Sequence, residues 1–391
     1  LPTSPVRGLF RHDSRAWAVA GAVCYELFGD GSYIARAGSV INDGLPALMH
    51  SNGLPGGQLA ITSGRRFGIL NLSTNLWTPD VRTDADSAAF IDGYFVTLDV
   101  QTSTVCQSDL ENGLVFGGTV FLKRQIGSDA LVSMAELNRM LVLLGTTTSE
   151  GWYNAGTSPF AFAPAQSVGL VDTGCIAAGS VARCDNSLFW LGRSAHGLGS
   201  VFRTVGYQAQ RVSTHIVEQA ISGYGTITDA TAWSYVDRGH AFYVLVFPTA
   251  GACWAYDATA GVWAERAFWN TSTGLWELYK PRHHCFAFGK HLVGDGASGA
   301  VYNLSPTTYT DAGGVPLRRM RQGPYVTQEQ KWFYHRRFWL DIETGVGNSA
   351  ATDPLVMLEY SDDKGKTWKA ATDKAIGAVG NTNTRVEWRR L

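Results

Sequence analysis

The hydrophobic residues of this chain fall in short runs that recur along its first three quarters. Each run has the length of one β-strand and is bounded by turn-forming residues. Pairs such as Asp92-Gly93 and Asp295-Gly296 lie between the runs and favour hairpins, because glycine accepts a positive φ at little cost. The pattern predicts an antiparallel all-β fold. The runs are Trp17 to Ala20, Leu59 to Thr62, Tyr94 to Val100, Leu141 to Leu144, Leu188 to Leu191, Phe242 to Phe247 and Cys285 to Phe288.

One stretch, Ser213 to Ile221, has a helical pattern instead. Ser213 is of a type that caps a helix N-terminus, and Ile216, Val217 and Ala220 form an apolar face at helical spacing. We therefore expect one short connecting helix in an otherwise β chain.

Repeats indicate how the strands are grouped. A turn signature, Asn/Asp-x-x-x-Gly/Asn-x-Trp, occurs at 71–77, 257–263 and 270–276, and the segments 59–72 and 291–304 align without gaps. The side chain of the first Asn or Asp can form a hydrogen bond with the backbone two residues further on. The Gly or Asn adopts the left-handed backbone conformation, and the Trp begins the next strand and packs against the core. Four-stranded units of 40 to 50 residues are typical of propeller blades. We predict a β-propeller of six or seven blades over residues 1–312; a pair of β-sandwiches is the alternative.

The charge pattern changes after this region. Residues 315–391 hold 13 basic and 9 acidic residues, against 19 and 24 in the rest of the chain. We predict an additional C-terminal β unit over 313–391. It contains a full Asp-box pattern, in which Asp363 can satisfy turn amides, Gly365 supplies the bend and Trp368 packs beneath the hairpin. The residues of this structural hairpin are Ser361, Asp363, Gly365, Thr367 and Trp368.

Composition excludes several classes of protein. Of 391 residues only 17% are charged and the net charge is −1, so no strong field attracts DNA or an anionic membrane. Six scattered cysteines without a CxxC pair are expected to be reduced core thiols. No apolar run is long enough to span a bilayer, so we expect no membrane anchoring in this chain. Since the chain opens with Leu1-Pro2 and not Met, we expect its natural N-terminus to lie upstream.

Candidate chemistry is sparse. The Asp box is shared with sialidases, but such hydrolases need paired catalytic carboxyls or an equivalent pair and an arginine cluster, and the sequence shows one Asp box and no arginine triad. His283-His284-Cys285 is the best metal candidate, yet neighbouring residues of a strand point to opposite faces. We predict no catalytic, metal-binding or cofactor-binding residues, and therefore no enzyme.

A basic and aromatic run is the strongest interaction candidate. From Lys331 to Leu340, alternation places several aromatic side chains on one face of a strand and basic groups on the other. One interpretation is an edge strand whose arginines stay in water; the other is a subunit interface, where Arg, Trp and Tyr are enriched. Direct base readout is not expected. The candidate interface residues are Arg318, Arg319, Arg321, Lys331, Trp332, Tyr334, Arg336, Arg337 and Trp339.

Several segments together resemble a known family, the packaged-DNA stabilisation proteins of short-tailed bacteriophages, also called tail hub or nozzle proteins. The likeness extends over 6–391 and is most specific at 145–220 and 355–391. It rests on Glu150 to Gly156, Pro159-Phe160, Ser180 to Arg183, Asn186 to Gly192, Gly206 to Glu218, Tyr360 to Trp368 and Val386 to Leu391.

The resemblance implies a structural virion protein, assembled in the host cytoplasm and located in the phage tail. It implies a homo-oligomeric ring, expected to be a hexamer, below the portal and head-to-tail adaptor. Such a ring extends the DNA channel, retains packaged DNA that passes without sequence-specific binding, and offers attachment surface to a fibre or spike and to a needle or plug protein. The alternatives are a carbohydrate-binding β-propeller or sialidase-like glycosidase, and a kelch-like scaffold that binds peptides.

Overall fold

The computed structural model describes the whole chain except residues 3, 119, 125–126, 166–169, 195–196, 207, 325, 327–333, 348–351 and 390–391. It divides into two compact units, residues 1–318 and 319–391. In the described part no helix is long and apolar enough to cross a membrane.

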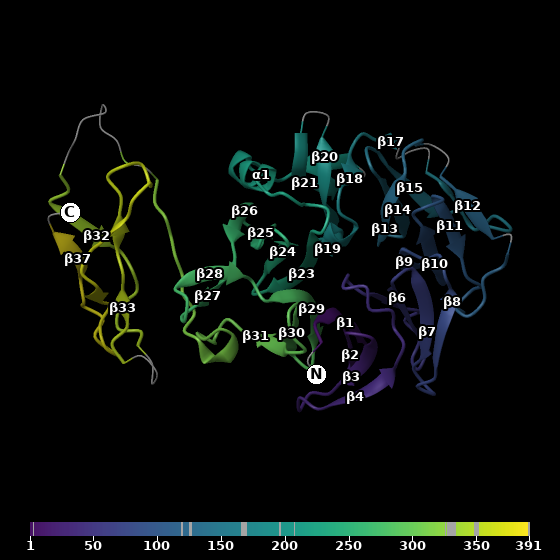
Figure 1. Cartoon of the computed structure of the whole chain (residues 1–391), viewed down its shortest axis with the longest axis horizontal. Helices are drawn as coiled ribbons and strands as arrows, with labels where there is room; N and C mark the ends of the chain where they lie inside the picture. Colours follow the sequence, from purple (N-terminus) through teal and green to yellow (C-terminus); the bar gives the residue numbers. More distant parts are fainter. Residues whose placement is uncertain are drawn as a thin grey trace. The chain divides into compact units, whose positions relative to one another are not determined.

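The first unit is a seven-bladed β-propeller, which confirms the predicted fold class and excludes the sandwich pair. Its antiparallel sheets follow one another around a ring (Figure 1). Blades 1 to 3 are β1 (Val6–His12), β2 (Arg15–Ala20), β3 (Val23–Leu27) and β4 (Tyr33–Ala37); β5 (Leu48–Ser51), β6 (Gln58–Ser63), β7 (Arg66–Asn71) and β8 (Trp77–Arg82); and β9 (Ser87–Ile91), β10 (Tyr94–Asp99), β11 (Thr104–Gln107) and β12 (Phe121–Lys123).

Blades 4 and 5 each have one interrupted strand. Blade 4 splits its outer strand and blade 5 its inner strand, the latter around a 3-10 turn, η1 (Ala178–Ser180). The strands are β13 (Leu131–Leu137), β14 (Met140–Gly145), β15 (Ser149–Asn154), β16 (Phe162–Pro164) and β17 (Leu170–Val171) in blade 4, and β18 (Gly174–Cys175), β19 (Ala182–Cys184), β20 (Ser187–Ser194), β21 (Gly197–Val205) and β22 (Gln208–Arg211) in blade 5.

Blade 6 is regular, whereas blade 7 has three strands in the described part of the chain. A separate hairpin, β27 (Ala267–Asn270) with β28 (Leu275–Leu278), lies between the two blades in sequence. Blade 6 is β23 (Thr231–Asp237), β24 (His240–Phe247), β25 (Ala252–Asp257) and β26 (Val262–Glu265), and blade 7 is β29 (Pro281–Ala287), β30 (Lys290–Asp295) and β31 (Val301–Leu304), followed by η2 (Ala312–Gly314).

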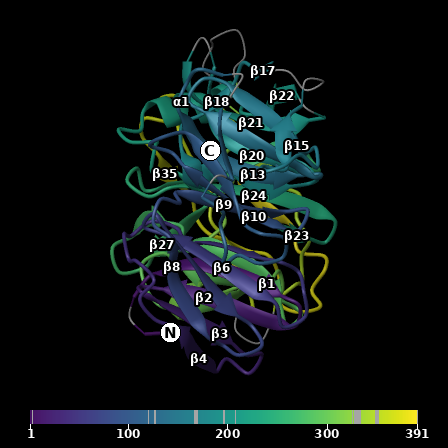
Figure 2. The same cartoon turned by 90° about the vertical axis from the view of Figure 1, so that its right-hand side faces the viewer.

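The second strand of each blade explains the apolar runs of the sequence. Five of the seven runs lie in second strands, a sixth lies in the second strand β10 except for Val100, and the last lies mostly in β29. In β2, Trp17 and Val19 pack against blade 2, while Ala16 and Ala18 pack against blade 7. Successive side chains of a strand point to opposite faces, so a strand between two neighbouring blades must be apolar at every position. Figure 2 shows blade 1 beside β6 and β8 of blade 2.

The core of the propeller is a series of seams. Among the described residues, each of seven hydrophobic clusters combines side chains from two neighbouring blades, including blades 7 and 1. Blades 7 and 1 are also joined by a hydrogen bond from Val6 N to Ser298 O, 3.1 Å. Because every seam has its own cluster, the ring is closed. All six cysteines are buried and not bonded to one another, as expected.

The edge of blade 7 carries unused backbone groups. Within the described part of the chain, β31 pairs only with β30. The bond from Asp295 N to Ala300 O, together with the register, directs the N–H groups of Tyr302 and Leu304 toward β30. Those of Val301 and Asn303 therefore point away from the sheet.

The first side chain and the left-handed residue of the turn signature behave as predicted. The side chains of Asn71, Asp257 and Asn270 each accept bonds from the backbone N–H groups two and three residues on, at 2.9 to 3.3 Å. Asn75 and the two glycines at 261 and 274 have positive φ. The gapless repeat is less exact: Leu59 pairs with Leu70, but the aligned His291 pairs with Leu304, two positions further along. The loop of blade 7 is longer by those two residues.

The predicted helix exists and Val217 is buried as predicted, but the predicted cap was wrong and Ile216 does not belong to the buried face. Helix α1 (His215–Ser222) begins after Thr214, which makes no side-chain capping bond. Ser213 instead accepts a bond from Val201 N. Val217 and Ile221 are the buried positions, while Ile216 is 74% exposed. The helix packs on blade 5 through a narrower face than the periodicity indicated.

In its described residues the second unit has three antiparallel strand pairs around a small core. The core is Ile376, Val386 and Trp388, with Leu340 and Leu358 against it. The pairs are β32 (Arg337–Leu340) with β37 (Val386–Arg389), β33 (Leu355–Val356) with β36 (Lys374–Ala375), and β34 (Glu359–Tyr360) with β35 (Lys369–Ala370).

Candidate functional site

The Asp box forms the turn between β34 and β35. Asp363 accepts bonds from Thr367 N at 2.8 Å and Thr367 Oγ1 at 2.6 Å, and Ser361 Oγ accepts from Gly365 N at 2.8 Å. The bonds from Thr367 and Ser361 lower the pKa of Asp363 to about 2. Trp368 is 46% exposed, so it covers the turn less fully than expected. The carboxylate is occupied by the turn itself.

The structure distributes the candidate interface residues over both units. Arg318 belongs to the propeller unit, where its guanidinium lies 4.0 Å from the ring centroid of Trp269 and 5.6 Å from that of Trp276. The indole of Trp276 therefore supports an arginine at the surface and is not in the core, contrary to the expectation for its turn. Arg319, Arg321, Tyr334 and Arg336 are exposed in the second unit, and Lys331 and Trp332 lie outside the described residues.

Two of the candidates, Arg337 and Trp339, lie on the exposed face of the β32–β37 pair. The register places Arg337 opposite Arg389 and Trp339 opposite Glu387. The alternating positions, Phe338, Leu340, Val386 and Trp388, turn to the other face, where Val386 and Trp388 are buried and Leu340 packs against them. Side chains alternate between the two faces of β32 as predicted, but the aromatic and basic residues are not separated, because Trp339 lies on the same face as Arg337.

Glu387 organises this exposed face. Its carboxylate accepts a bond from Trp339 Nε1 at 2.7 Å, lies 3.2 Å from Arg337 Nε, and pairs with Arg389. The bond from Arg389, then that from Trp339, holds the pKa of Glu387 below its ordinary value. Arg385 lies over the indole of Trp339, 4.6 Å from the ring centroid. We call Arg337, Trp339, Arg385, Glu387 and Arg389 the Arg–Trp face.

Sequence reasoning missed three members of the Arg–Trp face. Arg385, Glu387 and Arg389 belong to a segment whose alternation, Val-Glu-Trp-Arg, matches that of β32. That alternation was a usable signal for a strand with one apolar face. The pattern could not predict that this segment pairs with β32, which lies about 50 residues earlier in the sequence.

The histidines do not form a metal site. Among described residues, no group of three or more His, Cys, Asp or Glu side chains could hold an ion. His284 Nε2 lies 3.0 Å from His291 Nδ1, and the two rings stack at 5.2 Å. Burial, with a smaller effect of His291, lowers the pKa of His284 to about 4, and burial lowers that of His283 to about 3. The rings of His283 and His284 are therefore neutral near neutral pH.

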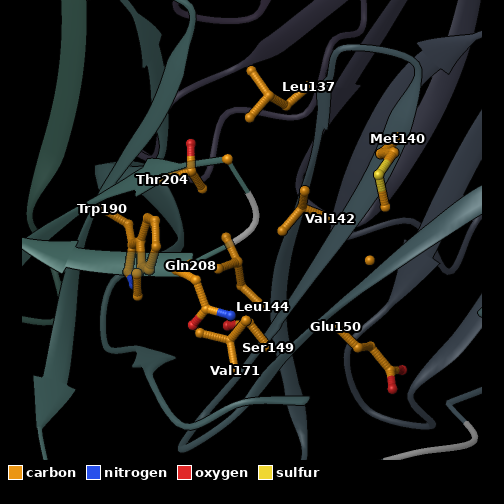
Figure 3. Close-up of a pocket in the computed structure, with 13 residues that line it drawn as sticks. Leu137, Met140, Val142, Leu144, Ser149, Glu150, Val171, Trp190, Thr204 and Gln208 are labelled. Carbon is orange, nitrogen blue, oxygen red and sulfur yellow. The ribbon is translucent and has the colours of Figure 1, made fainter. Parts of the chain in front are cut away.

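A cavity of about 30 Å³ lies between blades 4 and 5 (Figure 3). Apolar side chains such as Met140, Val142 and Trp190 line most of it, and its single carboxyl is Glu150. That carboxylate points away from Gln208 and lies 3.4 Å from Arg124 Nε. Most glycosidases need two carboxyl groups, and Glu150 is the one carboxyl among the residues that line this cavity.

Both units match models of known protein families. The family described as bacteriophage P22 Gp10, beta-propeller, matches residues 5–309, and the one described as bacteriophage P22 Gp10, beta-sandwich, matches residues 318–391. The chain belongs to the bacteriophage P22 Gp10 family. The suspected relationship to phage packaged-DNA stabilisation proteins is confirmed, and the Gp10 family makes this chain a structural tail protein of the propeller type.

Solved structures outside the Gp10 family share the fold alone. Two structures of the extracellular domain of BT4673 from B. thetaiotaomicron, one titled a one-component and the other a hybrid two-component system, superpose with TM-scores of 0.51 and 0.50 at 7% identity. They cover 79% of this chain, which spans about 40% of their length. No curated protein matches the chain. These distant structures therefore give no information on the function of this Gp10-family chain.

Proposed function

We propose that the chain is a tail hub, or nozzle, subunit of a short-tailed phage. Six copies form a ring below the portal and head-to-tail adaptor, extend the DNA channel and retain the packaged genome. The outer surface of the ring attaches a fibre or spike, and a needle or plug protein closes the channel. The subunit assembles in the host cytoplasm and remains in the virion. The observation that carries the proposal is the match of both units, in order, to the Gp10 family.

The charge of the chain supports a passive conduit. Each phosphate that a basic residue neutralises adds salt-dependent affinity, and such affinity would hold DNA that must leave the particle. A chain with 32 basic and 33 acidic residues adds little of it. Closing a ring requires a heterologous interface, in which one patch meets a different patch on the neighbour. Two units with distinct surfaces provide such patches.

Electron microscopy of the purified chain and of the phage particle tests the proposal. We expect a six-fold ring in both, and a tail map in which the ring directly follows the adaptor. A chain that stays monomeric at the high local concentration of a virion, or a particle map without this subunit in the tail, contradicts the proposal.

The glycosidase or carbohydrate-binding alternative is tested separately. A glycan array and an assay of reducing-sugar release are expected to show neither binding nor turnover, because the Asp-box carboxylate is engaged within its turn. Turnover would assign an additional activity to the chain, whatever its oligomeric state.

A further inference from the structure

The Arg–Trp face carries an excess of positive charge in a fixed arrangement. It presents three guanidinium groups and one carboxylate. The side chain of Glu387 is only 11% exposed. It already forms ion pairs with Arg337 and Arg389 and accepts a hydrogen bond from the Trp339 indole. Arg385 lies over the indole and pairs with no carboxylate among the described residues. The face therefore has two positive charges without a compensating carboxylate, beside an indole that is 53% exposed.

This arrangement is suited to binding another protein. Arginine and tryptophan are enriched among the residues that contribute most to binding at interfaces, because both present a large planar surface and arginine also carries several hydrogen-bond donors. Here Glu387 and the indole already hold the guanidinium groups, so less side-chain entropy is lost on binding. Phe338 and Trp388 anchor the strand pair from beneath, with ring centroids 5.9 Å apart. The partner that fits is an acidic surface with room for an indole.

The chain itself supplies such a partner. Residues 1–318 hold 20 basic and 24 acidic residues, whereas residues 319–391 hold 12 and 9. The propeller is thus net negative and the second unit net positive. In a ring, every copy presents both units, and opposite charge favours heterologous contact between them over contact of like with like.

We infer that the Arg–Trp face docks on the acidic propeller of a neighbouring copy. The inference rests on the proposed ring and adds the residues, the partner unit and the physical basis of the contact. Of the nine residues expected at the interface, it retains Arg337 and Trp339. It adds Arg385, Glu387 and Arg389. Arg318 is not part of the Arg–Trp face, because it belongs to the propeller unit.

A charge-reversal pair with a matched control tests the inference. Arg337→Glu with Arg389→Glu changes the charge of the Arg–Trp face, and Lys364→Glu with Lys366→Glu makes the same change at exposed positions of the Asp-box turn in the same unit. Sedimentation at several salt concentrations gives the protein concentration of half-assembly. We expect the first pair to raise it by about tenfold or more and the control to alter it by less than about twofold. Near-ultraviolet circular dichroism verifies folding.

Photo-crosslinking identifies the partner surface. A benzoylphenylalanine at position 339, in a mixture of isotopically light and heavy chains, is expected to link to residues within 1–318 of a different copy. Links confined to the same chain, or reversal variants that assemble like the parent, overturn the inference while leaving the ring intact. A parent chain that does not assemble removes both the ring and the contact. Assembly that is unaffected by the reversal, with loss of DNA retention in an electrophoretic assay, would reassign the face to nucleic acid.

Discussion

Glu26 offers the sharpest test of the forces within one blade. It lies on β3 with its carboxylate nearly inaccessible, 2.6 Å from Arg15 Nε and 2.7 Å from Arg36 Nη2. Arg15 also donates to Leu72 O at 2.7 Å and to the Asn75 side chain at 2.9 Å, so the group connects blade 1 to the turn of blade 2. Replacing Glu26 with Gln keeps the shape and removes the charge that holds both arginines.

The magnitude follows from burial. Removing one partner of a fully buried ion pair costs about 3 to 5 kcal/mol. The side chains of Arg15 and Arg36 are 28% and 24% exposed, so water compensates part of the lost charge. We expect Glu26→Gln to lower the free energy of unfolding by about 2 kcal/mol at pH 7. Urea unfolding, followed by tryptophan fluorescence, measures this difference directly.

The pH dependence distinguishes charge from shape. Burial raises the pKa of Glu26, but hydrogen bonds and charges from Arg15 and Arg36 outweigh it and leave the pKa below 4.5. The stabilisation is therefore complete above pH 4.5 and is lost as the pH falls through the lower, folded-state pKa. The gap between parent and Glu26→Gln should close in that range. A gap equal at pH 7 and pH 3 refutes the reasoning. Asp80→Asn, at an exposed carboxylate, is the control and should change stability by less than about 0.5 kcal/mol.

Three further predictions concern packing, the Asp box and the blade edge. Trp152→Ala removes a fully buried indole and should lower the free energy of unfolding by about 3 to 5 kcal/mol; a loss under about 1 kcal/mol would mean that the seam repacks. Asp363 should keep its charge down to about pH 2 in a carbon-detected NMR titration, and Asp363→Ala should abolish the slow exchange of the Thr367 amide; an ordinary titration near pH 4 contradicts this. In a monomer, the Asn303 amide should exchange faster than that of Tyr302, and equal rates would show that β31 has a further strand partner.

The sequence predicted the fold where one physical rule dominates. A second strand is buried on both faces, so its apolar run is continuous and visible, as in Phe242 to Phe247. The Asx turns were equally readable because a single side chain and one left-handed residue determine them. Outer strands such as β12 are short and partly exposed, and the inner strand of blade 5 is interrupted, so neither gives a periodic signal. The sequence alone consequently could not decide between six and seven blades.

Only part of the candidate site could be predicted from the sequence, and the reason is topological. Arg337 and Trp339 stand out because basic and aromatic residues are concentrated around them. Their neighbours Glu387 and Arg389 come from a strand at the other end of the second unit, and only the pairing of β32 with β37 joins them. Conversely, Arg318 was grouped with the run by sequence proximity, although it stacks on a tryptophan of the propeller hairpin. Contact between distant segments depends on the fold and leaves no mark in a local pattern.

The seams of the propeller differ in the size of their buried side chains, and the seam of blades 7 and 1 contains several small ones. Its buried members include Ala16, Ala18 and Ala287, whereas the seam of blades 3 and 4 buries Trp152 and several large aliphatic and aromatic side chains. Hydrophobic stabilisation grows with the apolar area removed from water, so alanines contribute little. Close approach compensates only in part: Phe288, held at a positive φ, packs over Gly29, where a Cβ would lie 3.4 Å from its ring. The ring therefore closes through a seam that is rich in small side chains, where the hydrogen bond from Val6 N to Ser298 O adds a backbone link between blades 1 and 7.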